Sequence, residues 1–342
     1  KMKQEFYLRN RKNYLEKVQK QSLSLFFSGE VYPKSADQDY QFSVDKNFYY
    51  LTGLNQANLI LALVKGEEEK AILFIEENDP VLSKWVGSKL EIEEAKALSG
   101  IDDVRYLKDF NSFLFYSFNS IRYSKESFTS LYLSLERRDD PQYSSIALRF
   151  ANEFKTKYPE VLIKDSYNIV IGLRMIKSED EIALIKESIT STKEGIEVLM
   201  TKAKAGLYEY QLEAYFDFHL KYNGQKTTSF ETIAASGKNA TILHYVSNDS
   251  LLKDGELILF DLGCSTDFYI SDISRTFPIN GKFTQRQKDV YEEVLAVNKK
   301  CIEILKPGLT WQELNEYARE LLTEGLKRLG LLKDKSELSR YY

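Results

Sequence analysis

Two aspartates in the segment 256–278 are the residues whose type and spacing could do chemistry. Asp261 follows the apolar run Leu257–Phe260, and Asp272 comes eleven residues later. Aspartate is depleted from strands, and a buried carboxylate costs free energy unless a partner compensates its charge. The two side chains therefore need an explanation beyond packing.

The segments around the two aspartates predict the strands of a β-hairpin. With Thr266 and Asp267 as a two-residue loop, Asp261 and Asp272 are expected directly opposite each other on one face. The Cβ atoms of such a pair are about 5 Å apart. At that distance like charges repel by roughly 3 kcal/mol at an effective dielectric near 20.

Two arrangements relieve this repulsion. One carboxylate can be protonated, as in a coupled acid pair, or cations can lie between the two groups. Hard divalent ions favour oxygen ligands, and two metals about 3.5–4 Å apart form a hydrolytic device. A simpler alternative is that Asp261 caps a strand end and Asp272 is solvated beyond a longer turn. The spacing alone leaves these alternatives open.

Composition describes an ordinary globular protein of about two domains, with 342 residues, 43% of them hydrophobic and 29% charged. The net charge of -4 argues against a nucleic-acid binder that works by charge. No apolar run approaches the roughly 20 residues of a membrane span, and the Lys-rich start lacks the apolar core of a signal peptide. The only cysteines, Cys264 and Cys301, form no disulfide framework, so a cytoplasmic location is expected.

Residues 1–165 predict an α/β domain in which short strands alternate with amphipathic helices. The strands are expected at 23–27, 59–63, 71–75 and 131–135, and the helices near 5–20, 91–98, 109–118 and 141–157. A further strand is expected over Val161–Ile171. Ser178 and Glu181 form a capping box, which predicts the first helix of a second domain over 166–342.

The second domain contains a faint internal repeat. Its first copy has Gly206, Leu207, Leu212 and Tyr215, and its second has Gly308, Leu309, Leu314 and Tyr317, at a constant offset of 102 residues. A helix is expected before and after each glycine. Strands follow the first copy, whereas the sequence ends after the second. We therefore expect a duplicated domain seen without its second set of strands, with apolar helix faces over 285–330 left uncovered.

Several segments of this sequence resemble the aminopeptidase P and prolidase group of pita-bread metallopeptidases with a creatinase-type N-terminal domain. The resemblance to the N-terminal domain of that group lies in SGEVYPKSADQDYQFSVDKNFYYLTGL and DPVLSKWVGSKL. The resemblance to its linking helix lies in LRMIKSEDEI. The resemblance to the first half of that group's catalytic domain lies in FETIAASGKNATILHY, DGELILFDLG and YISDISRTFP. The resemblance implies an α/β creatinase-like domain followed by an α+β pita-bread domain, seen incomplete.

The resemblance implies a metal site. Asp261 and Asp272 match the first two of five ligands of a dinuclear site for divalent ions, with Asp272 bridging both. Mn²⁺ is the first candidate, and Co²⁺ and Zn²⁺ are alternatives. The other ligands, a histidine and two glutamates, have no match here. Weak or absent metal binding and little turnover are therefore expected of this chain by itself.

Further residues receive roles around that site. His244 matches a histidine that contacts substrate or intermediate, and imidazole suits proton transfer near neutral pH. His219 is expected to be a packing residue. Trp85 is either a surface-packing residue or an interface residue, and we expect it near a subunit contact or at a rim that binds the peptide. Arg275 is expected on the face opposite to Asp272, in a structural ion pair, hydrogen-bonded to a carboxylate behind the metal ligands, or as a solvated strand residue; the ion pair is favoured.

The leading functional hypothesis is a metal-dependent Xaa-Pro aminopeptidase that acts on peptides with proline at the second position. Such cleavage needs a dedicated enzyme because proline lacks an N–H and restricts the local backbone. A homodimer or homotetramer is expected, without nucleic acid or membrane as a partner. The alternatives are a non-catalytic peptide-binding relative and a metal-free creatinase-like C–N hydrolase. Both leave two facing carboxylates uncompensated.

Overall fold

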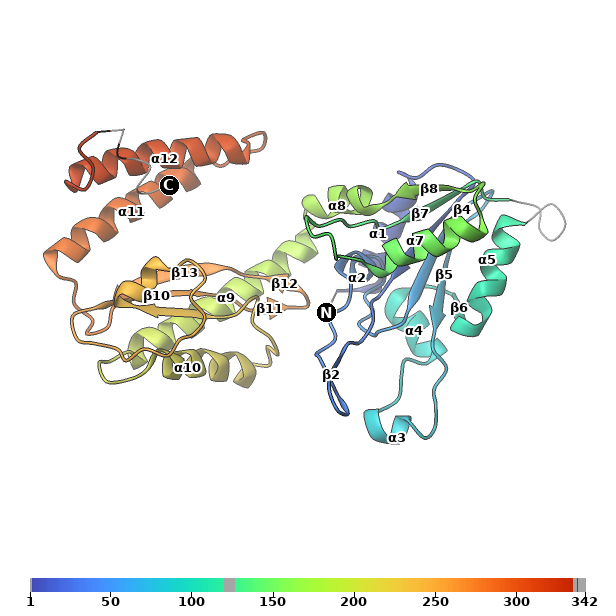
Figure 1. Ribbon diagram of the computed structural model, residues 1–342, viewed down its shortest axis with the longest axis horizontal. Coiled ribbons are helices and arrows are strands. Elements are labelled where there is room, and N and C mark those ends of the chain that lie inside the picture. Colours follow the sequence, from blue (N-terminus) through green and yellow to red (C-terminus); the bar gives the residue numbers. More distant parts are fainter. Residues whose placement is uncertain (1, 120–126, 335–336, 338–342) are drawn as a thin grey trace. The chain divides into compact units, whose positions relative to one another are not determined.

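The computed structural model describes residues 2–119, 127–334 and 337. It divides the chain into two compact units, unit 1 (Lys1–Ile182) and unit 2 (Ala183–Tyr342), drawn in Figure 1. The boundary expected between residues 165 and 166 falls earlier than this division. The reason is helix α8 (Tyr167–Met175), which packs against α1 (Gln4–Leu15) and α2 (Lys46–Thr52) of unit 1.

Unit 1 is built on a six-stranded mixed sheet. In spatial order its strands are β6 (Asp103–Tyr106), β5 (Glu69–Ile75), β4 (Ile60–Lys65), β1 (Ser22–Phe27), β7 (Ser130–Leu133) and β8 (Leu162–Asp165). β4 runs antiparallel to β1 and β5, whereas β1, β7 and β8 run parallel. The central strands β1 and β7 are buried along almost their whole length, serines included, because both faces of the sheet are covered.

Helices cover the two faces of this sheet. One face packs against α5 (Phe110–Phe118) and α7 (Ile146–Lys157), which pack their aromatic side chains into the core. The other face meets α1, where Tyr14 packs edge-to-face on Phe26 with ring centroids 5.2 Å apart. The remaining elements are α3 (Ser83–Val86), α4 (Ile92–Ser99), the short 3-10 helix η1 (Leu107–Asp109) and the small hairpin of β2 (Pro33–Ser35) and β3 (Gln38–Asp39).

The expected strand over Val161–Ile171 is wrong in its second half. The strand β8 ends at Asp165, and α8 begins at Tyr167. The Asp165 side chain causes the change, because its Oδ1 accepts hydrogen bonds from the backbone N–H groups of Tyr167 (2.8 Å) and Leu135 (3.1 Å). A carboxylate that binds backbone donors at this point ends a strand and starts a helix.

Unit 2 packs two helices on one face of a three-stranded antiparallel sheet. The helices are α9 (Glu179–Lys202) and α10 (Glu209–Tyr222), and the strand order is β13 (Ile273–Pro278), β10 (Leu257–Leu262), β9 (Ile233–Ser236). Two short strands, β11 (Ser265–Thr266) and β12 (Tyr269–Ile270), continue the hairpin of β10 and β13, and the 3-10 helix η2 (Gly237–Thr241) follows β9. The shared core contains Leu199, Phe216 and Phe260.

The repeat predicted from glycine and leucine spacing has the expected helix order. Gly206 lies between α9 and α10, and Gly308 lies between α11 (Gln285–Glu303) and α12 (Trp311–Arg328). Both glycines have a left-handed φ, of 89° and 93° respectively, which glycine adopts without strain. α11 and α12 pack against each other as an antiparallel pair (Figure 1) and leave several large apolar side chains exposed, including Ile302 and Trp311. No described helix is both long and apolar enough to cross a membrane.

Candidate metal site

The two aspartates lie on one hairpin, but its register differs from the predicted one. Asp261 pairs with Ser274 rather than with Asp272. The turn residues are Asp267 and Phe268, both with positive φ (51° and 69°), instead of Thr266 and Asp267. Two central residues with positive φ define the turn type that matches the twist of a hairpin. The predicted register is therefore wrong by two residues.

A shift of two residues keeps each side chain on its original face, because side chains alternate with a period of two. Asp272, just before β13, thus remains beside Asp261 as a diagonal neighbour. Burial, the negative charge of Asp261 and a side-chain hydrogen bond between the two groups raise the pKa of Asp272. Ser274 Oγ donates a second hydrogen bond to Asp261 Oδ1 at 3.1 Å. The two carboxylates therefore form one interacting pair.

The charge of this pair suits a divalent cation. Among the described residues, no ion pair involves Asp261 or Asp272, so no lysine or arginine neutralises them. Carboxylate oxygens are the ligands that hard divalent ions prefer. The described part of the chain has no group of three or more His, Cys, Asp or Glu side chains arranged to hold a metal, so Asp261 and Asp272 stand there as a pair of carboxylates.

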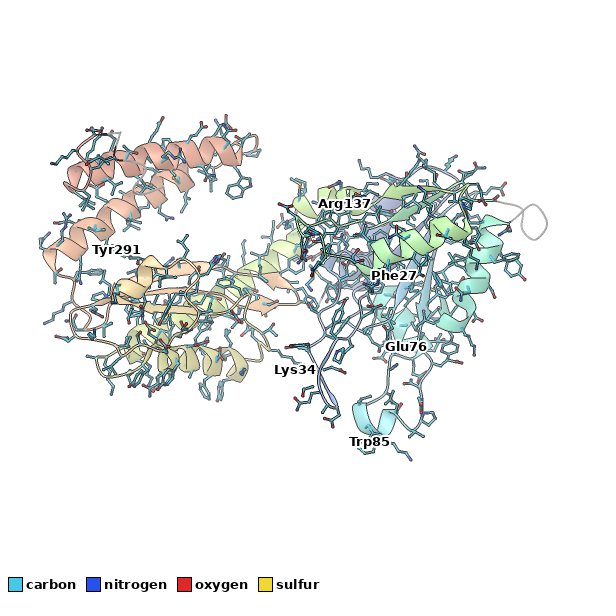
Figure 2. The ribbon with its side chains drawn as sticks, in the orientation of Figure 1. Phe27, Lys34, Glu76, Trp85, Arg137 and Tyr291 are labelled. Carbon is cyan, nitrogen blue, oxygen red and sulfur yellow. The ribbon has the colours of Figure 1, made fainter. Side chains whose placement is uncertain are left out.

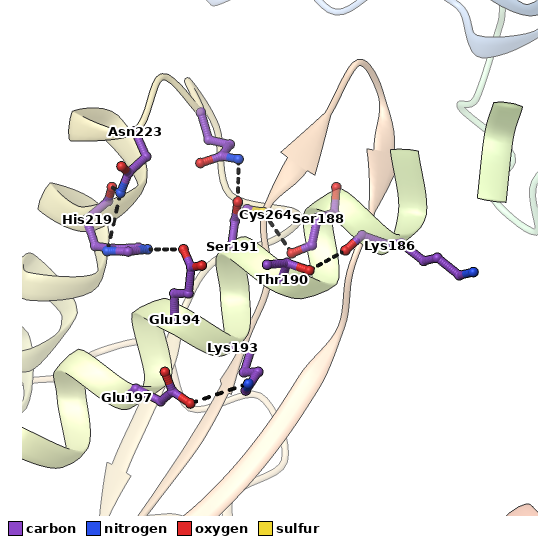
Figure 3. Close-up of polar contacts among 11 residues, drawn as sticks. Lys186, Ser188, Thr190, Ser191, Lys193, Glu194, Glu197, His219, Asn223 and Cys264 are labelled. Atoms are coloured by element: carbon purple, nitrogen blue, oxygen red, sulfur yellow. Dashed lines mark hydrogen bonds and ion pairs between the residues drawn. The ribbon is translucent and has the colours of Figure 1, made fainter. Parts of the chain in front are cut away.

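A buried polar network fixes the hairpin to α9 just before Asp272. Ser271 Oγ lies 2.8 Å from Thr192 Oγ1 and accepts a hydrogen bond from the Cys264 N–H at 3.1 Å. Cys264 Sγ donates to the Ser188 carbonyl at 3.3 Å (Figure 3). Cys264 and Ser271 are both buried. Because Ser271 precedes Asp272, this network also sets the position of that carboxylate.

His244 lies in an exposed turn after η2. The next residue, Tyr245, is buried and packs with Ile233 and Ala235 of β9. Ile233 pairs with Asp261, so these side chains share the face of the sheet that carries the carboxylate pair. The structure therefore brings the loop of His244 to the same side of the sheet as Asp261.

Arg275 lies on the opposite face, as expected, because it pairs with Phe260 in the helix-covered core. Its guanidinium is exposed, and Nη1 donates to the Ser274 carbonyl at 2.8 Å. Within the described residues it forms neither the expected ion pair nor a hydrogen bond to a carboxylate. The edge position of β13 explains this, since the side chain is free to extend into solvent.

His219 packs between α9 and α10, in agreement with its expected structural role. Its Nε2 lies 3.9 Å from Glu194 Oε2, and its Nδ1 lies 3.4 Å from Asn223 Nδ2 (Figure 3). The ring is largely buried, with 14% of the side chain exposed.

Trp85 belongs to unit 1, where it stands on the four-residue helix α3 (Figure 2). Its side chain is 81% exposed, and its neighbours Val81, Leu82 and Val86 are exposed as well. We call these four residues the Trp85 patch. A cluster of large apolar side chains in contact with solvent is typical of an interaction surface.

Sequence reasoning missed Glu209 and Asn248, two buried polar residues that hold the loop of His244. Asn248 adopts a left-handed φ of 48°, which asparagine tolerates better than most residues. The one signal for Glu209 is its place in the first turn of α10, where a carboxylate is favoured in any helix. Neither pattern by itself distinguishes these residues from ordinary turn and helix-start residues.

Two family descriptions match the chain. Residues 183–337 match Metallopeptidase family M24, and residues 7–122 match the Aminopeptidase P, N-terminal domain. The Xaa-Pro aminopeptidase of Haemophilus influenzae is 33% identical, over 97% of this chain and 74% of its own length. The Xaa-Pro aminopeptidase of Escherichia coli is 30% identical, with the same two shares.

Solved structures agree in fold. A protein from Bacillus anthracis, provisionally described as an aminopeptidase P, superposes with a TM-score of 0.95 at 43% identity and covers 100% of this chain and 80% of its own. Escherichia coli aminopeptidase P in its low-pH form has a TM-score of 0.88 at 28% identity and covers 99% and 77%. The fold is an α/β creatinase-like domain followed by a pita-bread metallopeptidase domain, as predicted. The chain belongs to the Xaa-Pro aminopeptidase family of metallopeptidases.

Proposed function

We propose that this protein is a metal-dependent Xaa-Pro aminopeptidase, which removes the N-terminal residue that precedes proline in a peptide. The observation that carries the proposal is the Asp261–Asp272 pair, whose charge no described side chain neutralises, in a member of this family. A non-catalytic or metal-free relative would leave that charge uncompensated. Membership of a metallopeptidase family implies divalent metal cofactors.

The number and the kind of the metal ions belong to the same proposal. We propose two divalent ions, with Mn²⁺ as the first choice and Co²⁺ or Zn²⁺ as alternatives; one similar structure is a zinc-substituted Escherichia coli aminopeptidase P with product. Asp261 and Asp272 would hold the metal. When bound, such ions supply a Lewis acid and a water of lowered pKa.

The other residues bind and orient the peptide in this proposal. His244, exposed on the side of the sheet that carries the carboxylates, donates or accepts a proton near the scissile bond, which imidazole does well near neutral pH. We assign Arg275 no contact with the metals, because it lies on the face opposite to the carboxylates and its guanidinium is exposed.

We further propose a homodimer or homotetramer in the cytoplasm, with the Trp85 patch at a subunit contact or at the rim that receives the peptide. The exposure of four neighbouring apolar side chains supports an interface. The described cysteines, Cys264 and Cys301, are free thiols, as is usual in a reducing compartment.

The test compares two peptides that differ only at the second position, one with proline and one with alanine. The protein at its full natural length is stripped with a chelator and assayed before and after Mn²⁺ is restored. We expect hydrolysis of the proline peptide alone, and only with metal. Equal cleavage of the alanine peptide, or full activity without metal, would contradict the proposal.

Asp272→Asn tests the metal ligand directly. This change should lower both bound metal and hydrolysis by more than about 100-fold, because it removes a charged ligand rather than an outer contact. The matched control is Asp267→Asn at the turn of the same hairpin, where asparagine suits the left-handed backbone. Unchanged metal stoichiometry in Asp272→Asn would remove Asp272 from the site.

A further inference from the structure

A fully buried carboxylate in the first turn of α10 collects five hydrogen bonds. Glu209 Oε1 accepts from the Ser236 N–H (2.7 Å), from Ser236 Oγ (2.7 Å) and from Asn239 Nδ2 (3.1 Å). Glu209 Oε2 accepts from the Tyr245 hydroxyl (2.7 Å) and from the Ser250 N–H (3.0 Å). Every one of these donors belongs to a single stretch, residues 236–250.

The charge of Glu209 is well compensated where it lies. Burial alone would raise its pKa, but the hydrogen bonds from Ser236, Tyr245 and Ser250 outweigh burial and hold the pKa below its usual value. The N-terminus of α10 also favours a negative charge at this position. The ionised carboxylate therefore stays inside the protein as an acceptor, and charge-assisted bonds of this kind are the strong ones.

A second carboxylate, one turn later on α10, holds the same stretch. Glu213 Oε2 accepts from Asn248 Nδ2 at 2.8 Å. Asn248 is buried, and it also accepts from the Ala234 N–H (2.9 Å) and donates to the Thr232 carbonyl (2.8 Å). Asn248 thus satisfies backbone groups at β9 that an edge strand would otherwise leave unpaired.

The turn that carries His244 has little packing of its own. Its neighbour Leu243 is 88% exposed, and Ile242 is exposed too. The first anchored residue after the turn is Tyr245, whose ring packs on the Asp261 side of the sheet while its hydroxyl reaches Glu209. The position of His244 is therefore set by the anchors on both sides of it.

We propose that Glu209 is the positioning residue for His244: its carboxylate ties both ends of the 236–250 loop to α10 and so holds the imidazole on the carboxylate side of the sheet. The inference rests on the proposed function for the role of His244, but the anchoring itself does not. Trypsin cleavage tests whether Glu209 anchors the loop, and kinetics with a proline peptide test whether this anchoring positions His244.

The first measurement follows the loop without any activity. Glu209→Gln keeps the shape but replaces one acceptor oxygen with an amide that must face existing donors. Trypsin cleavage after Lys238, an exposed residue of η2, should become about tenfold faster or more, because the loop opens locally. The control is Leu212→Ala, which lowers stability in the buried core of the same helix without touching the loop.

The second measurement uses the protein at its full natural length with Mn²⁺ and a proline peptide. Glu209→Gln should lower kcat by about 100-fold, because a misplaced proton-transfer group costs roughly that factor, while KM changes little. Tyr245→Phe removes one donor and keeps the ring, so a smaller loss in the same direction is expected. Leu212→Ala should keep kcat close to wild type at temperatures where it is folded.

The outcomes of the two measurements either support or overturn the positioning role of Glu209. If folded Glu209→Gln is cleaved at Lys238 no faster than Leu212→Ala, or if the two variants lose kcat equally, the positioning role is overturned. If Glu209→Gln does not fold, Tyr245→Phe decides by the same two criteria. If the wild-type protein does not hydrolyse proline peptides, the proposed function fails, and the trypsin comparison still judges the anchoring.

Discussion

Gly263 lets the hairpin close tightly beside the carboxylate pair. A Cβ atom at this position would lie 1.9 Å from the Ser271 carbonyl oxygen, a backbone atom that cannot move independently. Because Asp272 follows Ser271 directly, any relief of that clash displaces a proposed metal ligand. Gly263→Ala should therefore lower stability by about 1–3 kcal/mol, the usual cost of overpacking, and also weaken Mn²⁺ binding. Urea unfolding and a metal titration measure the two effects.

Gly172→Ala is the control for that substitution. Gly172 lies in α8, where nothing comes within 4 Å of an added Cβ. Alanine in a helix interior is more stable than glycine by roughly 0.5–1 kcal/mol, so this change should stabilise unit 1 and leave metal binding alone. A Gly263→Ala protein with wild-type stability and metal affinity would show that the hairpin relaxes without moving Asp272.

At the scale of one element, the start of α12 depends on a reciprocal cap. Thr310 Oγ1 accepts from the Glu313 N–H at 3.2 Å, and Glu313 Oε2 accepts from the Thr310 N–H at 2.8 Å. Thr310→Ala removes one half of this capping box and should weaken the first turn by about 1 kcal/mol. Hydrogen exchange of the first-turn amides of α12 measures the loss. Thr201→Ala in α9, whose hydroxyl donates to the Val198 carbonyl of its own helix, should leave those amides unchanged.

The same cap predicts a pH dependence. Hydrogen bonds from the Thr310 backbone and then its side chain lower the pKa of Glu313 in the folded helix. A lowered pKa means that the ionised form stabilises the cap. Its contribution is complete above the unfolded pKa of about 4.3 and disappears as the pH falls through the lower folded value. Protection factors in the first turn should fall as the pH drops below the unfolded pKa of about 4.3, and Glu313→Gln should remove that dependence.

At the scale of the whole molecule, the Trp85 patch is the surface that tests the proposed oligomer. Trp85→Glu places a charge among exposed apolar side chains, so it should weaken a contact between subunits without unfolding unit 1. Sedimentation velocity at micromolar concentration should show a smaller species than wild type. Phe115→Glu, an exposed aromatic position on α5, serves as the control. A wild-type monomer, or a Trp85→Glu protein of unchanged size, would contradict this assignment.

Much of the fold follows from local patterns in the sequence. The apolar runs at 59–63 and 71–75 are strands because β-branched and leucine side chains suit a buried sheet, and they pair as β4 and β5. The face shared by Asp261 and Asp272 was predictable as well, since the alternation of side chains survives a two-residue error in register. The resemblance of the motifs around them to a metallopeptidase family was confirmed.

Tertiary structure decided the features that depend on residues far apart in the chain. The hairpin turn at Asp267 and Phe268 contains no glycine to mark its positive φ values, so local propensity placed it one residue too early. The roles of Glu209 and Asn248 exist only once α10, β9 and the 236–250 loop have packed together. Sequence determines periodicity and turn preference residue by residue, whereas burial of a carboxylate among five donors is a property of the assembled core alone.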